Sequence, residues 1–453
     1  MRTLSQSRPQ SAQILLVALL SCAILGLTLA SALLLVQSQA LSVARSMGWN
    51  ASLAMTEAGI EEALTHLNRN APFFDPAEAT NQLAAHGWSR DGNVYRAPRR
   101  YLAPDSYYDV RIVLQGTQPQ LYATGVVNRA DLIPTVPALA TIGPGAAGLY
   151  APVPRVVQVL TRSDPLFSVA MAAEGQIDLA GNNVTTDSFD SGDPNFSDNG
   201  LYPFNNPEKR KKNGDVATNA GLINSINVGN AKINGKAQTG PNGTVRIGPN
   251  GYVSGGTNDD FNVAFPPVRL PPTLGWLLPT LPADVQIDGV SYRHVILQSG
   301  SYYLNQGLAG SLYVGTNVQA TLVLTGNTKL TGNSDRIYLA PGARLILFMD
   351  APEFSLKGRG VVNATGRAQN FLYFGTPRNT KLSLGGNAAF TGAIYAPDAD
   401  FTLGGGGNDT YDFIGASVTK TVKMNGHFHF HYDENLRRVG PSRGFLVTSW
   451  REL

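Results

Sequence analysis

The sequence is short of cysteine, and its one cysteine, Cys22, lies inside a long apolar run. No disulfide can form within the chain, so packing and hydrogen bonds must stabilise it. Charge is scarce too: Asp, Glu, Lys and Arg make up 15% of the 453 residues, and the net charge is +3. This near-neutral balance predicts no nucleic-acid partner. The one basic run, Lys209–Lys212, is best interpreted as a solvated loop.

Recognisable catalytic motifs are missing as well. The sequence has no nucleophile elbow, no phosphate loop and no metal-ligand spacing of a catalytic kind. Carboxylates of the second half are scattered and form no motif: Asp288, Asp335, Asp350, Glu353 and Asp398. We therefore expect no enzyme activity, and we assign no catalytic, cofactor-binding or metal-binding residue and no cofactor.

A long apolar run is the most informative feature present. Residues Ile14–Val36, roughly 23 in number, carry no charge and can cross the ~30 Å core of a bilayer as one helix. The helical pattern continues to Asn70 with an apolar stripe formed by Leu53, Ile60, Ala63, Leu64 and Leu67. Basic residues before the run predict a cytoplasmic tail, 1–13. We expect a single-pass inner-membrane protein with its bulk periplasmic or extracellular.

The segment that follows the apolar run carries a family pattern. Ala54–Ala63 reads A-x-x-E-A-G-x-x-E-A, with Glu57, Gly59 and Glu62 at its defining positions. This segment resembles the N-terminal helix of PilX-like type IV minor pilins and pseudopilins. The resemblance implies retention in the membrane and subunits of a type IV pilus or a related secretion filament as partners.

Processing of the N-terminus has two alternatives. A prepilin peptidase requires glycine before the cut and glutamate five residues after it, but Gln10–Ala12 and Leu16 or Val17 occupy these places. A signal peptidase could cut after Ser38–Ala40, which satisfies the small-x-small rule. The run is longer than an ordinary signal peptide requires, so we favour a retained anchor and leave both cleavages open.

Residues 37–165 predict a small α+β unit like that of pilins. Strand-like runs occupy Tyr107–Leu114, Leu121–Val127 and Arg155–Thr161, and the proline-rich stretch Ile133–Pro154 predicts a loop excursion. Such a sheet would cover the apolar stripe of the helix.

Residues 166–436 have a different pattern of apolar and turn-forming residues. Short apolar segments such as Leu322–Leu324, Ile337–Leu339 and Phe371–Phe374 alternate with Gly-Asn turns. Outward positions are mostly Thr, Ser, Asn and Gly, which favours a right-handed parallel β-helix over a β-sandwich or barrel. The proline-dense piece Phe265–Pro282 is either an insertion or a strap between two halves. Residues 437–453 would form a tail, and the fold class would be mainly β.

Four segments resemble an uncharacterised β-helix domain attached to pilin-like anchors in Gram-negative envelope proteins. They are Asn183–Asp190, Asn213–Asn219, Phe390–Asp400 and Phe430–Glu434. The resemblance implies a fold and a place in the envelope, but no activity.

Two clusters could bind a metal. His427, His429 and His431 alternate along one predicted strand with Asp433 in phase, which suits Zn²⁺ or Cu²⁺ or a polar outer face. We favour the polar face, with the intervening aromatic residues inside. The other cluster is a loop whose acidic residues could bind Ca²⁺ or form turns: Asp187, Asp190, Asp193 and Asp198. We favour turns there.

The function predicted from these patterns is that of a membrane-anchored, pilin-like envelope protein displaying a β-helix. Its role would be structural or adhesive, as a minor component of a type IV pilus or a related filament. The alternatives are a carbohydrate-binding or carbohydrate-cleaving β-helix with a glycan ligand, a self-polymerising surface scaffold, and an anchored surface protein without pilus contact.

Overall fold

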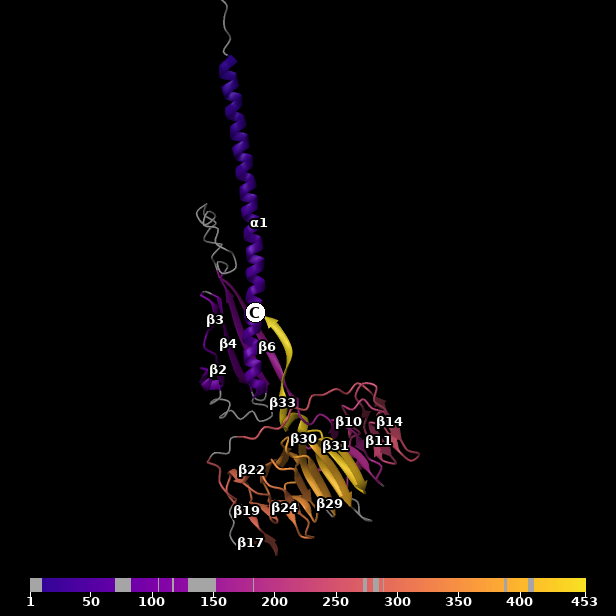
Figure 1. The fold of residues 1–453 in the computed structure, drawn as a ribbon. Coiled ribbons are helices and arrows are strands. Elements are labelled where there is room, and N and C mark those ends of the chain that lie inside the picture. Colours follow the sequence, from indigo (N-terminus) through magenta and orange to yellow (C-terminus); the bar gives the residue numbers. More distant parts are fainter. Residues whose placement is uncertain are drawn as a thin grey trace, which may run out of the picture. The chain divides into compact units, whose positions relative to one another are not determined.

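A computed structural model gives the fold of the chain (Figure 1). It describes residues 10–69, 83–104, 106–115, 118–128, 152–181, 183–271, 275–279, 285–287, 289–386, 389–405 and 411–453. The chain divides into two compact units. The first unit comprises 1–70, 74–163 and 444–453, and the second comprises 71–73 and 164–443.

The first unit is built on one helix, α1 (Gln10–Arg69), and an antiparallel sheet. The predicted long helix is confirmed as a single uninterrupted element. The strands of this unit are β1 (Ser89–Asp91), β2 (Val94–Arg96), β3 (Arg100–Ala103), β4 (Ser106–Gln115), β5 (Gln118–Val127), β6 (Val153–Pro165) and β33 (Ser442–Glu452). Strands β4, β5 and β6 confirm the three strand predictions. The predicted loop excursion lies outside the described residues, except for its last residues, of which Val153 and Pro154 belong to β6.

The sheet of the first unit has the order β1-β2-β4-β5-β6-β33, with β3 paired to β4. Strands β4, β5 and β6 form a meander in which each strand pairs antiparallel with the next. The expected C-terminal tail is wrong, because β33 extends this sheet beside β6. The side chains of Arg155 and Glu452 form an ion pair, and the backbone N–H of Leu453 donates to Val156.

The sheet covers the C-terminal half of α1 (Figure 1). Ile60, Ala63 and Leu67 of the predicted stripe are fully buried, and Leu53 and Leu64 are half-buried. The backbones come very close where Gly125 of β5 passes Ser52, since a Cβ on Gly125 would lie 2.3 Å from the Ser52 carbonyl oxygen. The absence of a side chain at Gly125 allows the helix backbone to pack directly against the strand.

The second unit is built of short strands in two sets, which we call the first arm and the second arm. The first arm consists of β7 (Met171–Ala173), β8 (Ile177–Asp178), β9 (Thr185–Phe189), β10 (Val216–Thr218), β11 (Ile226–Gly229), β12 (Lys232–Ile233), β13 (Ala237–Gln238), β14 (Val245–Ile247), β15 (Tyr252–Val253) and β16 (Thr257–Asn258). The loop between β9 and β10 contains two 3-10 turns, η2 (Pro194–Phe196) and η3 (Pro207–Lys209).

The second arm begins after a small hairpin of β17 (Val285–Ile287) and β18 (Val290–Tyr292). Its strands are β19 (His294–Ile296), β20 (Gly300–Leu304), β21 (Leu312–Val314), β22 (Gln319–Leu324), β23 (Thr328–Leu330), β24 (Arg336–Leu339), β25 (Arg344–Met349), β26 (Glu353–Leu356), β27 (Gly360–Asn363), β28 (Phe371–Gly375), β29 (Lys381–Gly386), β30 (Ala389–Gly405), β31 (Tyr411–Gly426) and β32 (Phe428–Asp433), with the 3-10 turn η4 (Ala368–Asn370) before β28 and the short helix α4 (Leu436–Val439) after β32. The segments predicted from their apolar pattern coincide with β22, β24 and β28.

Both arms belong to one parallel sheet, which has 24 strands among the described residues. Its pairings form three ladders, and the long strands β30 and β31 contribute to all three. In spatial order the first ladder is β16-β13-β10-β7-β31-β30-β28-β25-β22-β20, the second is β14-β11-β8-β31-β30-β29-β26-β23, and the third is β15-β12-β9-β32-β31-β30-β27-β24-β21-β19. The mainly β fold class is therefore confirmed.

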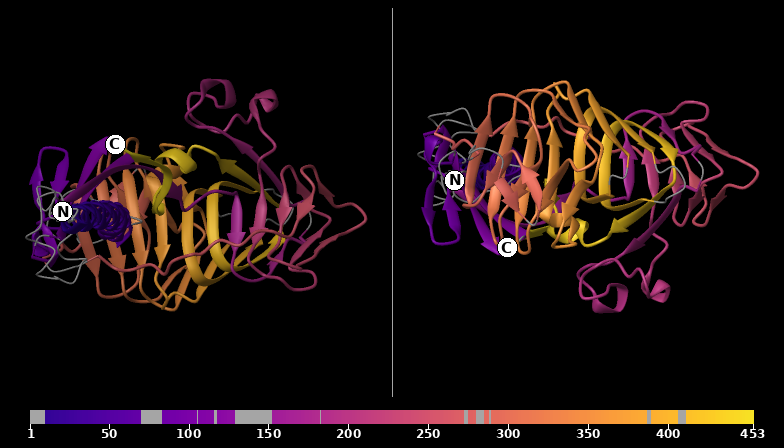
Figure 2. Two further views of the ribbon diagram at one scale, coloured as in Figure 1. Left: turned by 90° about the horizontal axis from the view of Figure 1, so that it is seen from above. Right: turned by 90° about the horizontal axis from the view of Figure 1, so that it is seen from below.

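The order of the ladders differs from the order of the chain. Strands β7 to β9 come first in the chain but lie in the interior of each ladder, between β10–β12 on one side and β31–β32 on the other. In Figure 2 the yellow strands of the second arm accordingly lie beside magenta strands of the first arm. We call this junction the seam. The chain thus enters at the seam, runs outward through the first arm, and returns through the second arm.

The proline-dense piece joins the arms as a strap. Val263 exchanges hydrogen bonds with Asn219 just after β10, Pro266 accepts one from Tyr395 of β30, and Leu277 bonds to the backbone of β20. These contacts follow the first ladder from the first arm to the far end of the second. Within Phe265–Pro282 the structure describes 265–271 and 275–279, and the contacts of these residues with β30 and β20 favour the strap over the insertion.

Candidate functional site

The site that unites the two sequence clusters lies at the seam, on the outer face of β32. The side chains of this strand alternate: Phe428, Phe430 and Tyr432 are buried in the core, as predicted, while the histidines point to the other face. Phe430 stacks on Phe413 of β31 with the ring centroids 4.2 Å apart.

His431 does not face solvent, and here the expectation of a polar outer face is wrong. Its side chain is only 5% exposed. The loop between β9 and β10 folds over it, and the ring of Tyr202 stacks on the imidazole at a centroid distance of 3.7 Å. The physical reason is that β32 pairs with β9, so the loop that follows β9 begins beside His431 and covers it. His429, by contrast, is 38% exposed.

Neighbouring strands supply two carboxylates to the same face. In the ladder register His431 is opposite Asp187 of β9, and His429 is opposite Asp412 of β31. The Nδ1 of His431 lies 2.6 Å from Asp187 Oδ1, and its Nε2 lies 3.0 Å from Asp412 Oδ1. Asp412 Oδ1 is also 3.7 Å from Nδ1 of His429. The imidazole of His431 is thus fixed between two carboxylates from different strands.

The electrostatics of the two histidines differ. Burial would lower the pKa of His431, but its hydrogen bonds to Asp187 and Asp412 outweigh burial and raise it. Burial lowers the pKa of His429, and the neighbouring His431 adds to that effect. Burial also raises the pKa of Tyr202, so its hydroxyl stays protonated and donates to Asp187 Oδ2 at 2.7 Å. The lowered pKa favours the neutral form of His429, whereas the raised pKa favours the protonated form of His431.

Three donor atoms converge at this place. Asp412, His429 and His431 each offer one ligand atom, and these atoms lie within 4.8 Å of one another. His427 precedes β32 and does not belong to this group. Among the sequence candidates, the structure therefore brings together Asp187, His429 and His431 and adds Asp412.

The rest of the acidic loop is used locally. Asp193 accepts a hydrogen bond from the Asn195 N–H and caps η2, which is the turn-forming role that we favoured. Asp198 pairs with Lys209 and accepts from Asn206, and Asn199 adopts a positive φ of 55°. These carboxylates serve the loop and its turns.

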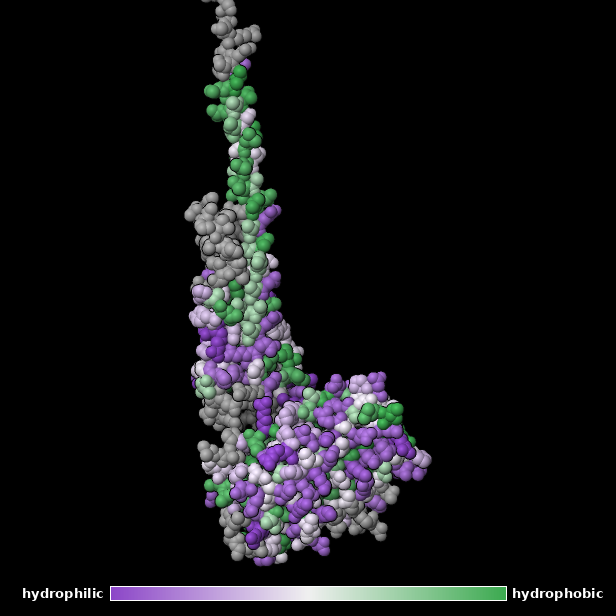
Figure 3. Space-filling model, viewed as in Figure 1, coloured by the Kyte–Doolittle hydropathy of each residue, from purple (hydrophilic) through white to green (hydrophobic). Residues whose placement is uncertain are grey.

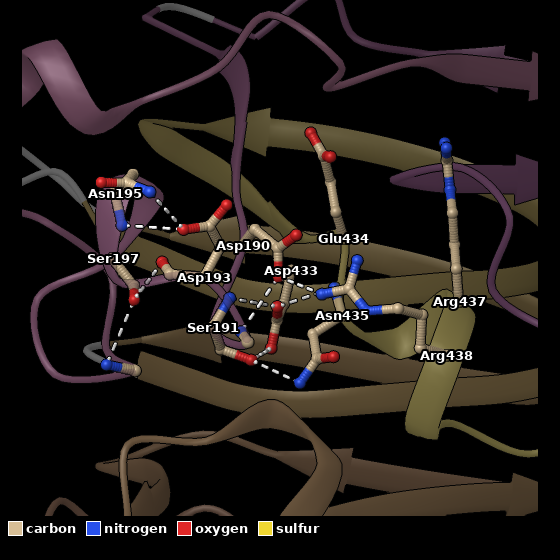
Figure 4. Close-up of polar contacts among 12 residues, drawn as sticks. Asp190, Ser191, Asp193, Asn195, Ser197, Asp433, Glu434, Asn435, Arg437 and Arg438 are labelled. Atoms are coloured by element: carbon tan, nitrogen blue, oxygen red, sulfur yellow. Dashed lines mark hydrogen bonds and ion pairs between the residues drawn. The ribbon is translucent and has the colours of Figure 1, made fainter.

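Residues 187–213, which are the end of β9 and most of this loop, contact residues 431–438, and we call these contacts the clasp. Figure 4 shows the part of the clasp that joins Asp190 and Ser191 to Asp433 and Arg438. Buried Asp433 accepts hydrogen bonds from the N–H and Oγ of Ser191, and Arg438 pairs with Asp190. Burial raises the pKa of Asp433. Burial would raise the pKa of Asp190 as well, but Arg438 outweighs that effect and lowers it.

Glu434 is the centre of the clasp on its other side. Its carboxylate accepts from Ser188 Oγ at 2.9 Å and from Asn213 Nδ2 at 2.7 Å, and it pairs with Lys211 Nζ at 2.5 Å. Sequence reasoning gave this residue no role. Its one signal was the segment Phe430–Glu434, which the β-helix resemblance had marked.

The scattered carboxylates of the second half that the structure describes have separate local partners and do not form one site. Asp350 pairs with Arg378, Glu353 bridges Lys329 and Lys381, and Asp335 accepts from the Gly332 N–H. Asp288 lies outside the described residues.

Comparisons with known proteins add little about function. The family model for a domain of unknown function (DUF7305) matches residues 281–439, which include the β17–β18 hairpin, the second arm and α4. No curated protein matches the chain. Among solved structures, the crystal structure of the competence-associated pilin ComZ from Thermus thermophilus is 10% identical, with a TM-score of 0.24, over 89% of this chain and 98% of that chain. A TM-score this low does not establish a shared fold.

Proposed function

We propose that this protein is a membrane-anchored, pilin-like envelope protein that displays a parallel β-helix outside the inner membrane. Its role is structural or adhesive rather than catalytic, as a minor component of a type IV pilus or a related filament. Residues 14–36 lie in the membrane, 37–165 form the pilin-like unit, and 166–436 form the β-helix domain. The observation that carries the proposal is the division of α1 into an exposed apolar half and a buried half.

The N-terminal half of α1 has the surface of a membrane span. Among the described residues, this helix is the one segment long and apolar enough to cross a membrane. Its large apolar side chains are exposed from Ile14 to Val36, and Figure 3 shows them along the free part of the helix. Exposed apolar surface of this extent has no place in water, so a bilayer is the environment that suits it.

The pilin-like pattern supports the proposal through the contacts of its residues. A Cβ on Gly59 would lie 3.1 Å from the Tyr108 ring and 3.3 Å from Ala123, so glycine permits close packing of helix and sheet. The carboxylate of Glu62 accepts hydrogen bonds from Trp88, Arg100 and Tyr108. Two of the residues that carry the resemblance, Gly59 and Glu62, therefore join α1 to its sheet.

The three ladders support the β-helix. A parallel β-helix stacks rungs of several short strands, so that each strand pairs in parallel with its equivalents one rung before and after. Like side chains then stack on one another, as Phe390, Phe413 and Phe430 do, with centroid distances of 4.5 and 4.2 Å. A core built in this way needs no disulfide.

Membrane retention tests the proposal directly. We expect the full-length chain to stay with the inner membrane after carbonate extraction, and N-terminal sequencing to find no product that begins at Leu41. Sheared surface filaments should contain the protein if it enters a pilus. Recovery of a soluble product that begins at Leu41 would contradict the anchor.

A matched pair of double variants sharpens this test. Ile24→Arg with Leu27→Arg places two charges in the span, at a cost of about 5–7 kcal/mol for insertion. Val43→Arg with Met47→Arg places the same charges at exposed positions of the same helix beyond Val36. The first pair should lower the membrane-bound fraction strongly and the second should not, whereas equal behaviour would refute the assignment of 14–36.

A further inference from the structure

We propose that Asp412, His429 and His431 form a binding site for a divalent transition-metal ion of the zinc type. Two imidazoles and one carboxylate are a ligand set that Zn²⁺ accepts, with a fourth position left for water. The histidines alone are spaced along one strand and do not close such a site. Asp412 from the neighbouring strand supplies the missing ligand.

The distances between the donor atoms suit this ion. Zn–N and Zn–O bonds of about 2.0–2.2 Å place the ligands of a tetrahedron about 3.3–3.6 Å from one another. Asp412 Oδ1 lies 3.0 Å from His431 Nε2 and 3.7 Å from His429 Nδ1. All three donor atoms lie within 4.8 Å of one another. The His429 side chain is half-exposed, so it has room to rotate toward the other two donor atoms.

Asp187 contacts the ring nitrogen of His431 that does not face Asp412. Its Oδ1 lies 2.6 Å from His431 Nδ1, so this nitrogen donates to the carboxylate and Nε2 is directed toward Asp412. Metal-ligating histidines commonly donate their second N–H to a carboxylate in this way. The stacked ring of Tyr202 and its hydrogen bond to Asp187 fix both partners. The ligands are thus oriented before an ion arrives.

Nε2 of His431 and Oδ1 of Asp412 lie 3.0 Å apart, so either an N–H hydrogen bond or a metal ion can join them. A proton on Nε2 fills this place when no metal is bound. When the ion binds, the metal–nitrogen bond replaces the N–H bond and the proton leaves to solvent. The Asp412 side chain is 34% exposed, which leaves an entry path.

The position of the site indicates what the ion would do. Asp412 belongs to β31, both histidines belong to β32, and Asp187 belongs to β9 of the first arm. An ion here would tie two strands of the second arm together and hold the residue that contacts the first arm. We therefore assign the site a stabilising role at the seam.

Zinc binding to the full-length chain in detergent tests the proposal. Equilibrium dialysis with elemental analysis should find one Zn²⁺ per chain, and the ion should raise the temperature at which the β signal is lost. Co²⁺ in place of Zn²⁺ should give the visible absorption of a four-coordinate site. His429→Ala and the isosteric Asp412→Asn should each weaken binding at least about tenfold.

His427→Ala is the matched control, because His427 is a partly exposed neighbour outside the donor cluster. It should leave affinity, stoichiometry and the cobalt spectrum unchanged. Absence of a stoichiometric ion would overturn the proposal and leave His431 as a protonated bridge alone. Equal losses for His427→Ala and His429→Ala would overturn it too, since they indicate adventitious binding to surface histidines. If His429→Ala loses its β signal in circular dichroism and therefore does not fold, the zinc affinity of Asp412→Asn tests the proposal instead.

Discussion

The two units differ in how chain order relates to spatial order. In the first unit the sheet follows the chain through β4, β5 and β6, and only β33 arrives from far away. In the second unit the first strands of the chain, β7 to β9, lie in the interior of the ladders and contact the last strands, β31 and β32. Local pairing therefore builds the first unit, whereas the second is complete only when its two ends meet.

Because of this difference, the correct choice of pairing partners matters most at the seam. Parallel strands present the same row of backbone donors and acceptors to any neighbour, so backbone pairing alone does not determine which strands meet. At the seam the side chains determine it. Phe430 stacks within the core, Glu434 fastens the loop after β9, and His431 meets Asp187.

The largest effect is expected from the core of the seam. Phe430→Ala removes a fully buried ring that stacks on Phe413, and it should lower the free energy of unfolding of the second unit by about 3–5 kcal/mol. Denaturant unfolding followed by the β signal in circular dichroism measures it. The control is Tyr252→Ala, at the outer end of the first arm, where the side chain is 52% exposed and the change should stay within about 0.5 kcal/mol. Equal losses would mean that the seam has no special role.

The clasp should give the next largest effect. Glu434→Ala leaves Lys211 and Asn213 without their buried carboxylate, and we expect a loss of about 3 kcal/mol. Glu353→Ala is the matched control, since Glu353 also pairs with two partners but both lysines are exposed, and about 0.5 kcal/mol is expected. The measurement is again denaturant unfolding, with limited proteolysis of the 190–215 loop. A clasp variant as stable as the control would show that the loop does not hold the arms together.

Much of the secondary structure could be predicted from the sequence because its causes are local. Apolar periodicity gave α1, strand-forming runs gave β4 to β6, and alternation placed Phe430 and Tyr432 in the core. The Gly-Asn turns and short apolar segments likewise indicated parallel strands in the second half. In each case neighbouring residues carry the signal.

The order of the arms, the strap contacts and the candidate site could not be predicted in the same way. Asp187 and His431 are far apart in the sequence and meet only because the chain enters the ladders at the seam. Asp412 has no motif of its own, and its pairing with His429 depends on the register of β31 and β32. The tail prediction failed for the same reason, because β33 is defined by its neighbour β6 rather than by its own pattern.

The smallest effect is expected in the first unit, and it depends on pH. Burial would raise the pKa of Glu62, but hydrogen bonds from Arg100, Tyr108 and Trp88 outweigh burial and lower it. A carboxylate with a lowered folded-state pKa contributes stability above its ordinary pKa and loses it as the pH falls through the folded value. Glu62→Gln should therefore cost about 2 kcal/mol at pH 7, and the difference from the unchanged protein should disappear in acid.

Trp88 provides the measurement, because its Nε1 donates to Glu62 Oε1 at 3.2 Å. Denaturant unfolding followed by tryptophan fluorescence at several pH values should show the two curves of stability converging as the pH falls below the ordinary range of glutamate. Glu61→Gln is the matched control, since Glu61 is the next residue of α1 and faces solvent. It should change stability little at any pH. A Glu62→Gln deficit that persists unchanged in acid would show that packing rather than charge joins α1 to its sheet, through the buried stripe and the close approaches at Gly59 and Gly125.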